Sequence, residues 1–117
     1  MLGDLDHIIV FVPDVGEAVA QYTGALGFRK LFGDDENFTA VSTGDGPWVG
    51  LHVSETGEAG EPSIPYFRVD SIEEAMDALR AKDVKVGNFH EVPTGRVATA
   101  WDVAGNPLGL YEPGTPS

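Results

Sequence analysis

The pattern of hydrophobic and polar residues predicts the same order of strands and helix in each half of the chain. An apolar run rich in β-branched residues over 5–12 predicts a strand, and apolar residues at helical spacing over 15–26 predict a helix after it. Three shorter apolar runs, each bounded by glycine, aspartate or proline, predict strands over 28–32, 38–42 and 48–53. The first half of the chain therefore reads as a strand, a helix and three strands.

The second half repeats this order. The same patterns predict a strand over 64–69, a helix over 71–82, and strands over 84–89, 96–102 and 108–112. A single unit of one helix and four strands cannot bury its own apolar face, so two such units are expected to pack together. The sequence predicts an α+β fold of paired βαβββ modules.

Both predicted helices begin with the same local signature. Asp14 and Ser71 are capping residues, and each precedes a glutamate, Glu17 or Glu74, by three positions. Gly27 is predicted to stop the first helix. Residues 54–63 show no periodicity, so residues 1–117 are interpreted as a single domain with a first module over 4–54, a linker over 55–63 and a second module over 64–113.

The composition of the chain indicates which kind of molecule the protein binds. The 117 residues carry 19 acidic and 7 basic side chains, a formal charge of −12, and such an acidic chain is not expected to bind nucleic acid. No apolar run is long enough to span a membrane, and the chain has neither a signal-peptide pattern nor a cysteine. These features favour a cytoplasmic protein whose partner is a small molecule.

Two distant stretches resemble a known family. Residues 6–14 (DHIIVFVPD) with 22–28 (YTGALGF) are similar to the first module of the vicinal oxygen chelate superfamily, and residues 95–113 are similar to its closing motif. That superfamily includes glyoxalase I, extradiol dioxygenases, and bleomycin and fosfomycin resistance proteins. The resemblance implies curved mixed sheets around a cavity, the glyoxalase/bleomycin resistance-like fold, and a homodimer.

The resemblance also implies four positions for the ligands of a divalent metal ion. They fall on His7, Gly50, Ile64 and Gly109, so a single position of the four carries a metal-binding side chain. No cofactor is therefore favoured. The alternative is a divalent metal ion held by His7, His52 and Glu112, although strand alternation places Glu112 on the face opposite that of Gly109.

Strand alternation, counted from His7, predicts which side chains line the cavity. Gly50 and Gly109 on the same faces are expected to leave room for a flat molecule against the backbone. Neighbouring positions such as Leu51, Phe67 and Leu110 are expected to cover the helices. The predicted ligand-binding residues are His7, Phe11, Trp48, His52, Tyr66, Arg68, Trp101 and Tyr111.

Each of these residues also has a plainer interpretation. The two histidines are also explained as hydrogen-bonded residues without a metal, and His90 as a surface residue. Arg68 fits a salt bridge as well as a ligand anchor, and Glu112 fits a solvated carboxylate. The two tryptophans, Trp48 and Trp101, are also explained as core residues.

Two functions of different class follow from these residues. The favoured one is a metal-free protein of glyoxalase/bleomycin resistance type that binds a small, flat, partly apolar ligand in the cavity between the modules. The alternative is a divalent-metal-dependent lyase or dioxygenase that uses His7, His52 and Glu112, with the metal polarising the substrate. Enzyme status stays open, because the sequence shows no nucleophile, base and orienting group in one set.

Overall fold

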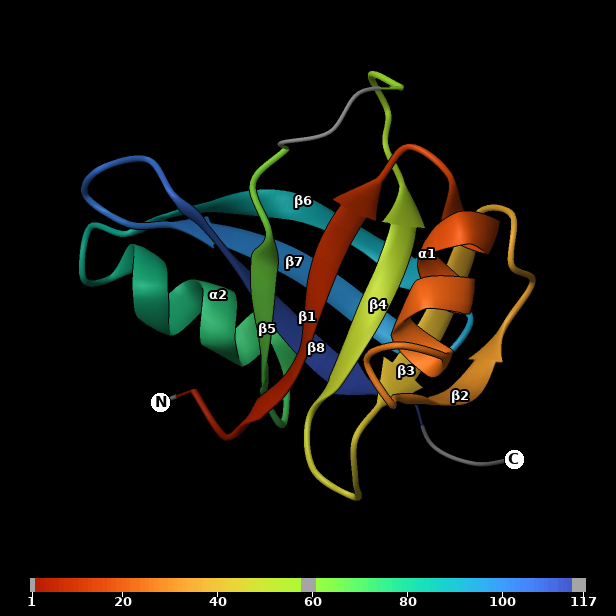
Figure 1. Ribbon diagram of the computed structural model, residues 1–117. Coiled ribbons are helices and arrows are strands. Elements are labelled where there is room, and N and C mark those ends of the chain that lie inside the picture. Colours follow the sequence, from red (N-terminus) through yellow and green to blue (C-terminus); the bar gives the residue numbers. More distant parts are fainter. Residues whose placement is uncertain (1, 58–60, 115–117) are drawn as a thin grey trace. The chain divides into compact units, whose positions relative to one another are not determined.

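A computed structural model describes residues 2–57 and 61–114 and shows the strand–helix–strands order twice (Figure 1). The first series is β1 (Leu5–Val12), α1 (Val15–Thr23), β2 (Arg29–Gly33), β3 (Phe38–Ser42) and β4 (Trp48–Val53). The second series is β5 (Ile64–Arg68), α2 (Ile72–Arg80), β6 (Lys85–Val92), β7 (Gly95–Trp101) and β8 (Pro107–Pro113). The predicted α+β fold of paired βαβββ modules is confirmed.

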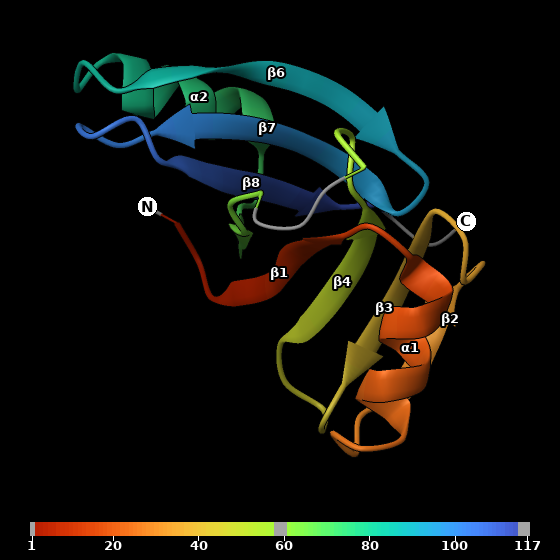
Figure 2. The same cartoon turned by 45° about the horizontal axis from the view of Figure 1, so that its top comes forward.

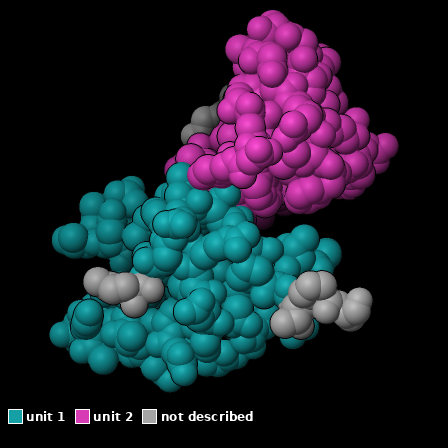
Figure 3. All heavy atoms as spheres, turned by 90° about the horizontal axis from the view of Figure 1, so that it is seen from below, with its two compact units in different colours: residues 1–6, 65–117 teal, residues 7–64 magenta. Residues whose placement is uncertain are grey.

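The chain divides into two compact units (Figure 3). Unit 2 is His7–Ile64, and unit 1 is Met1–Asp6 together with Pro65–Ser117. The first two residues of strand β1 belong to unit 1, and the rest of the strand belongs to unit 2. The start of the chain belongs to unit 1 because it is hydrogen-bonded to β5. The amide of Gly3 donates to the carbonyl of Arg68, and the amide of Arg68 donates to the carbonyl of Asp4.

In unit 2 the strand order is β2-β3-β4-β1, with β1 and β4 parallel and the other pairs antiparallel. Helix α1 lies against β2, β3 and β4 (Figure 2). The apolar positions of the helix meet those of the strands, which removes both from water. The buried core under α1 consists of Val15, Val19, Val41 and Leu51.

In unit 1 the strand order is β5-β8-β7-β6, with β5 and β8 parallel and the remaining pairs antiparallel. Helix α2 contacts β6, β7 and β8 (Figure 2). The buried core under α2 consists of Val69, Ile72, Met76, Ala98 and Leu110. Within the described residues of both units, no helix is long and apolar enough to cross a membrane.

Both predicted helix starts are confirmed, and both helices end earlier than predicted. The side chain of Asp14 accepts a hydrogen bond from the amide of Glu17 at 3.0 Å, and that of Ser71 accepts one from Glu74 at 3.3 Å. Helix α1 ends at Thr23 with Gly24 as its C-cap, not at position 26 before Gly27. Threonine and glycine are poor helix formers, so the helix stops at the first of the two glycines.

Strand β6 reaches further than predicted. It runs to Val92 rather than to residue 89, because it keeps pairing with β7 after an irregularity between Gly87 and His90. Asn88 adopts a left-handed conformation there, with φ of 53°, as asparagine tolerates. His90 is therefore part of a strand, and it is exposed, as predicted.

The predicted linker lies only partly within the structure, since residues 58–60 are outside the described residues. The carboxylate of Glu61 accepts hydrogen bonds from the hydroxyl of Ser54 at 2.5 Å and from the amide of Thr56 at 3.1 Å. These bonds tie the end of the segment to its start. The division into modules over 4–54 and 64–113 stays a prediction.

Candidate ligand-binding faces

In unit 2 the strands present one face to α1 and one face away from it. Val10 and Val12 of β1 and Val49, Leu51 and Val53 of β4 belong to the core under the helix. Because side chains alternate along a strand, the intervening residues of each strand lie on the helix-free face. Residues on this face are His7, Ile9 and Phe11 from β1 and Trp48, Gly50 and His52 from β4. The alternation predicted for these two strands is confirmed.

Aromatic rings cover this helix-free face, which we call the aromatic face of unit 2. His7 and Trp48 are opposite each other in the parallel register, and their rings are stacked at 4.1 Å. Phe11 meets His52 edge-on at 5.5 Å between ring centroids. The aromatic face comprises His7, Phe11, Phe32, Phe38, Trp48 and His52.

Phe32 and Phe38 were not among the predicted site residues. Phe38 pairs with His52 across β3 and β4, and its ring lies 6.1 Å from that of Trp48. Phe32 reaches Trp48 from the edge strand β2 at 5.5 Å. Alternation along β3 would have identified Phe38 once the pairing of β3 with β4 was known, whereas nothing in the sequence singles out Phe32.

His52 has a defined donor and acceptor. Its Nδ1 lies 2.7 Å from the carbonyl oxygen of Val53, and because a carbonyl can only accept, Nδ1 carries the proton. In the neutral ring Nε2 is then an acceptor, and it has no hydrogen-bond partner among residues 2–57 and 61–114. The aromatic face therefore includes one hydrogen-bond acceptor available to a ligand.

The space above Gly50 is filled, which corrects the prediction that glycine there admits a flat molecule. A Cβ at this position would lie 2.6 Å from the ring of Phe38 and 2.7 Å from Cδ1 of Ile9. Real Cβ atoms do not approach other atoms so closely, so Gly50 makes room for the chain's own side chains. The backbone of β4 is not exposed to a ligand at this point.

Unit 1 has a comparable helix-free face. Ala98 and Leu110 pack under α2, so alternation places Val97, Thr99, Trp101 and Tyr111 on the other side of the sheet. The predicted choice of Trp101 rather than Asp102 for this face is confirmed. Trp101 is half-buried, and Lys85 lies over it with the ammonium nitrogen 4.9 Å from the ring centroid.

Tyr66 occupies the space above Gly109. The two residues are opposite each other in the pairing of β5 with β8, and a Cβ on Gly109 would overlap the tyrosine ring. The expectation of open space over this second glycine is therefore wrong as well. Burial raises the pKa of the Tyr66 phenol, which stays protonated at neutral pH.

Arg68 forms a salt bridge, which was one of its two interpretations. Its Nε lies 2.5 Å from Oδ1 of Asp6, a buried carboxylate. This hydrogen bond raises the pKa of the guanidinium. Tyr111 is also engaged, because its hydroxyl donates to the carbonyl of Thr94 at 3.1 Å. The fixed guanidinium is half-exposed, so it keeps donors for a ligand.

The two tryptophans are not core residues. Trp48 and Trp101 are both half-buried, and neither belongs to the buried core under α1 or α2. The interpretation of these tryptophans as core residues is therefore not supported.

Glu112 is not a solvated carboxylate. It accepts a hydrogen bond from the backbone amide of Ile72 at 2.8 Å and another from Nη2 of Arg96 at 2.6 Å. The hydrogen bonds from Arg96 hold the pKa of Glu112 below its usual value of 4.5. Arg96 also forms an ion pair with Glu73, so the three side chains join β7, β8 and the first turn of α2. Sequence reasoning did not identify this cluster, because its members are far apart in the chain.

The residues present do not fit the implied metal centre. Rings fill the space at Gly50 and Gly109, two of the four implied positions, so a ligating side chain there would displace them. The carboxylate of Glu112 is held by Arg96 and the helix terminus rather than available as a ligand. Among the residues that the structure describes, no three histidine, aspartate or glutamate side chains are grouped to hold a metal ion.

Comparison with known families gives one match that covers most of the chain. The model of the Glyoxalase/Bleomycin resistance protein/Dioxygenase superfamily matches residues 4–109. No curated protein sequence matches the chain. The family match agrees with the repeated βαβββ order described above.

Solved structures share the fold at low sequence identity. Methylmalonyl-CoA epimerase from Mycobacterium tuberculosis is 18% identical, with a TM-score of 0.75 over 97% of this chain and 90% of that one. A superfamily member from Vibrio splendidus 12B01 is 16% identical, with a TM-score of 0.67 over 90% and 95%. The 2,3-dioxygenase LapB from Pseudomonas sp. KL28 is 22% identical, with a TM-score of 0.70 over 97% of this chain and 44% of that one. Enzymes of different chemistry thus share this fold.

Proposed function

Because the chain belongs to the glyoxalase/bleomycin resistance protein/dioxygenase superfamily, we propose that it binds a small, flat, partly apolar molecule without a metal ion. The aromatic face of unit 2 provides the binding surface. Its stacked His7–Trp48 pair is the observation that carries the proposal. A flat ligand gains contact area on such rings at little cost in side-chain entropy, because the rings already hold one another in place.

The helix-free face of each unit has polar groups of its own that can orient a ligand. Nε2 of His52 accepts a hydrogen bond from a ligand hydroxyl or amide. On unit 1, the half-exposed guanidinium of Arg68 suits an electron-rich edge, and Tyr66, Trp101 and Tyr111 lie on the same face. A few fixed polar groups among apolar ones are typical of small-molecule sites. The location of the site in a cavity between the modules remains a prediction. A homodimer and a cytoplasmic location also remain predictions.

Tryptophan fluorescence tests this proposal directly, because the chain has two tryptophans, one on each unit. Trp48→Phe and Trp101→Phe each leave a single emitter. We expect flat aromatic ligands, titrated from a panel, to change the emission of the protein that keeps Trp48. No response of Trp48 to any compound in a broad aromatic panel would contradict the proposal.

The metal-dependent alternative has a separate test. The superfamily is often metal-dependent, and the similar solved structures include dioxygenases. His7 lies at one of the implied ligand positions. A lyase or dioxygenase using His7, His52 and Glu112 requires that Glu112 leave Arg96. Activity lost with a chelator and restored by one divalent ion would support this alternative over the metal-free proposal.

A further inference from the structure

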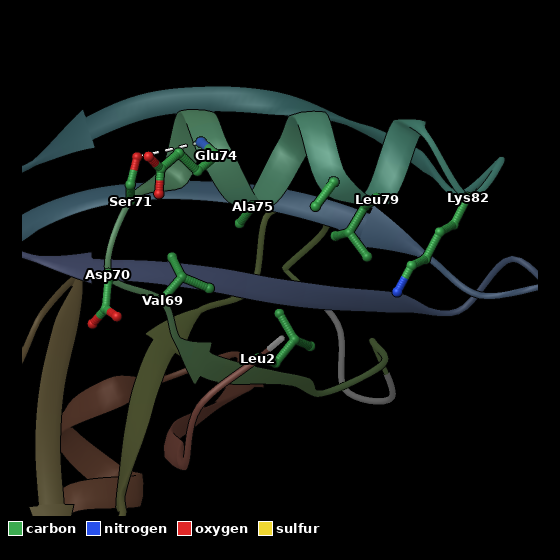
Figure 4. Close-up of a pocket in the computed structure, with 9 residues that line it drawn as sticks. Leu2, Val69, Asp70, Ser71, Glu74, Ala75, Leu79 and Lys82 are labelled. Atoms are coloured by element: carbon green, nitrogen blue, oxygen red, sulfur yellow. Dashed lines mark hydrogen bonds between the residues drawn. The ribbon is translucent and has the colours of Figure 1, made fainter.

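Unit 1 contains a cavity of about 270 Å³ on the side of its sheet that carries α2 (Figure 4). It lies between one stripe of α2, the end of β5 and the start of the chain. Leu2, Ala75 and Leu79 line it and are partly buried, and Val69 belongs to the buried core. The cavity is distinct from the helix-free face of unit 1, because these residues pack under the helix.

The polar residues of this cavity lie at its two ends. Asp70, Ser71 and Glu74 stand at the N-terminal end of α2, and Lys82 stands just beyond its C-terminal end. The nine residues of α2 between these two ends are about 14 Å long. Figure 4 shows the Lys82 side chain turned back so that its ammonium group points toward Leu79. The cavity is therefore acidic at one end, apolar in the middle and basic at the other end.

Lys82 differs from the other basic residues of this acidic chain. Among the described residues it has no ion-pair partner, although acidic side chains outnumber basic ones by 19 to 7. Lys85 lies over the ring of Trp101 instead. The basic residues that do pair with a carboxylate are Arg29, Lys30, Arg68, Arg80 and Arg96.

We propose that this cavity binds a small amphipathic monocarboxylate. The hydrocarbon part lies against Leu2, Ala75 and Leu79, where it removes apolar surface from water. The carboxylate lies at Lys82, which supplies the charge that the chain itself leaves unpaired there. The volume is just below the range of typical small-molecule sites, so the ligand is a short one.

The charged residues that line the cavity determine which class of ligand binds there and in which orientation. A single ammonium group balances one negative charge, whereas a phosphate dianion needs further donors that the cavity does not offer. Asp70 and Glu74 repel an anion from the opposite end, which leaves one orientation. A purely apolar ligand would leave Lys82 without a partner and would gain nothing from it.

Hexanoate is the probe for this proposal, with hexan-1-ol as its uncharged match. Methyl signals of Leu2, Leu79 and Val69 report occupancy in a carbon–proton NMR titration. We expect hexanoate to shift these signals and to bind more tightly than hexan-1-ol. A charge contact at an exposed lysine is worth up to about 1 kcal/mol, so Lys82→Gln is expected to weaken hexanoate binding about three- to fivefold.

Two variants make the test specific. Arg80→Gln removes a charge from the same helix but outside the cavity, and it is expected to leave hexanoate binding unchanged. Ala75→Leu fills the middle of the cavity and is expected to abolish binding; a thermal melt establishes that it remains folded. If Ala75→Leu does not fold, Lys82→Gln still tests the proposal.

Three results would overturn the proposal. These are unshifted methyl signals in hexanoate, equal binding of hexanoate and hexan-1-ol, and equal losses in Lys82→Gln and Arg80→Gln. Each outcome is independent of the proposed aromatic ligand, because neither Trp48 nor Trp101 lines this cavity. Failure here therefore leaves the fluorescence test of the proposed function unaffected.

Discussion

The imidazole of His7 lies flat against the indole of Trp48, with ring centroids 4.1 Å apart and planes inclined by 6°. The two residues are opposite each other on the parallel strands β1 and β4, on the face that α1 does not cover. His7 is 6% exposed, whereas Trp48 is only half-buried. The buried His7 ring thus holds the indole of Trp48 in place, and part of the indole surface remains exposed to a ligand.

His7→Ala is expected to lower the free energy of unfolding by about 1 kcal/mol through loss of the ring stacking. It is also expected to change the emission of Trp48, because the indole loses its neighbouring ring. Urea unfolding followed by fluorescence measures both. His90→Ala, at an exposed position, serves as the control with a change within about 0.5 kcal/mol. Equal effects of the two substitutions would show that the stacking contributes nothing.

Gly109→Ala is expected to destabilise the protein by about 2 kcal/mol, because the new methyl group overlaps the ring of Tyr66. The same substitution is expected to cost much less in a Tyr66→Ala background, where the ring is gone. Urea unfolding of the four proteins measures this coupling. Gly44→Ala is the control, since a Cβ there meets nothing within 4 Å. Additive effects at positions 66 and 109 would contradict the packing described here.

Acid stability is expected to depend on Glu112. Its pKa is lowered in the folded protein by the hydrogen bonds from Arg96, so its contribution to stability is present above the ordinary glutamate pKa of 4.5. The contribution is lost as the pH falls below 4.5 toward the lowered folded value. Glu112→Gln is therefore expected to be less stable than the wild type at pH 7 and to lose less stability on acidification. Urea midpoints between pH 7 and pH 3 measure the difference.

The control for that comparison is Glu17→Gln. The carboxylate of Glu17 makes no hydrogen bond or ion pair among the residues that the structure describes. Glu17→Gln therefore removes one negative charge without removing such a bond, and a change that both variants share comes from the loss of charge alone. If Glu112→Gln follows the same profile as Glu17→Gln, the cluster with Arg96 and Glu73 does not couple stability to pH.

Removal of metal ions is expected to leave ligand binding intact. The rings over Gly50 and Gly109 and the engaged carboxylate of Glu112 oppose a metal centre of the implied type. Calorimetric titration of the chelator-treated protein with Ni²⁺, Zn²⁺, Mn²⁺ and anaerobic Fe²⁺ should show no tight stoichiometric binding. Tight binding that His7→Ala removes and His90→Ala preserves would reinstate the metal-dependent function.

Part of the candidate site was predictable from local pattern. In each strand a period of two separates His7, Trp48 and His52 from the aliphatic residues that alternate with them, which are Ile8, Val10 and Val12 in the first strand and Val49, Leu51 and Val53 in the second. Phe32 was not predictable in this way, since a register shift between Lys30 and Phe32 in the pairing of β2 with β3 decides which face of the sheet it lies on. The pairing of Arg68 with Asp6 likewise needs β5 beside the start of the chain.

The sequence by itself determined the order of elements, the helix caps and the alternation of the strands, because these depend on neighbours within a few residues. Only the tertiary structure decided that Phe38 and Tyr66 fill the space over Gly50 and Gly109. It also decided that Glu112 binds Arg96 and the start of α2 instead of facing a ligand. Such contacts join residues distant in the chain, and the space around a glycine is set by side chains on other strands.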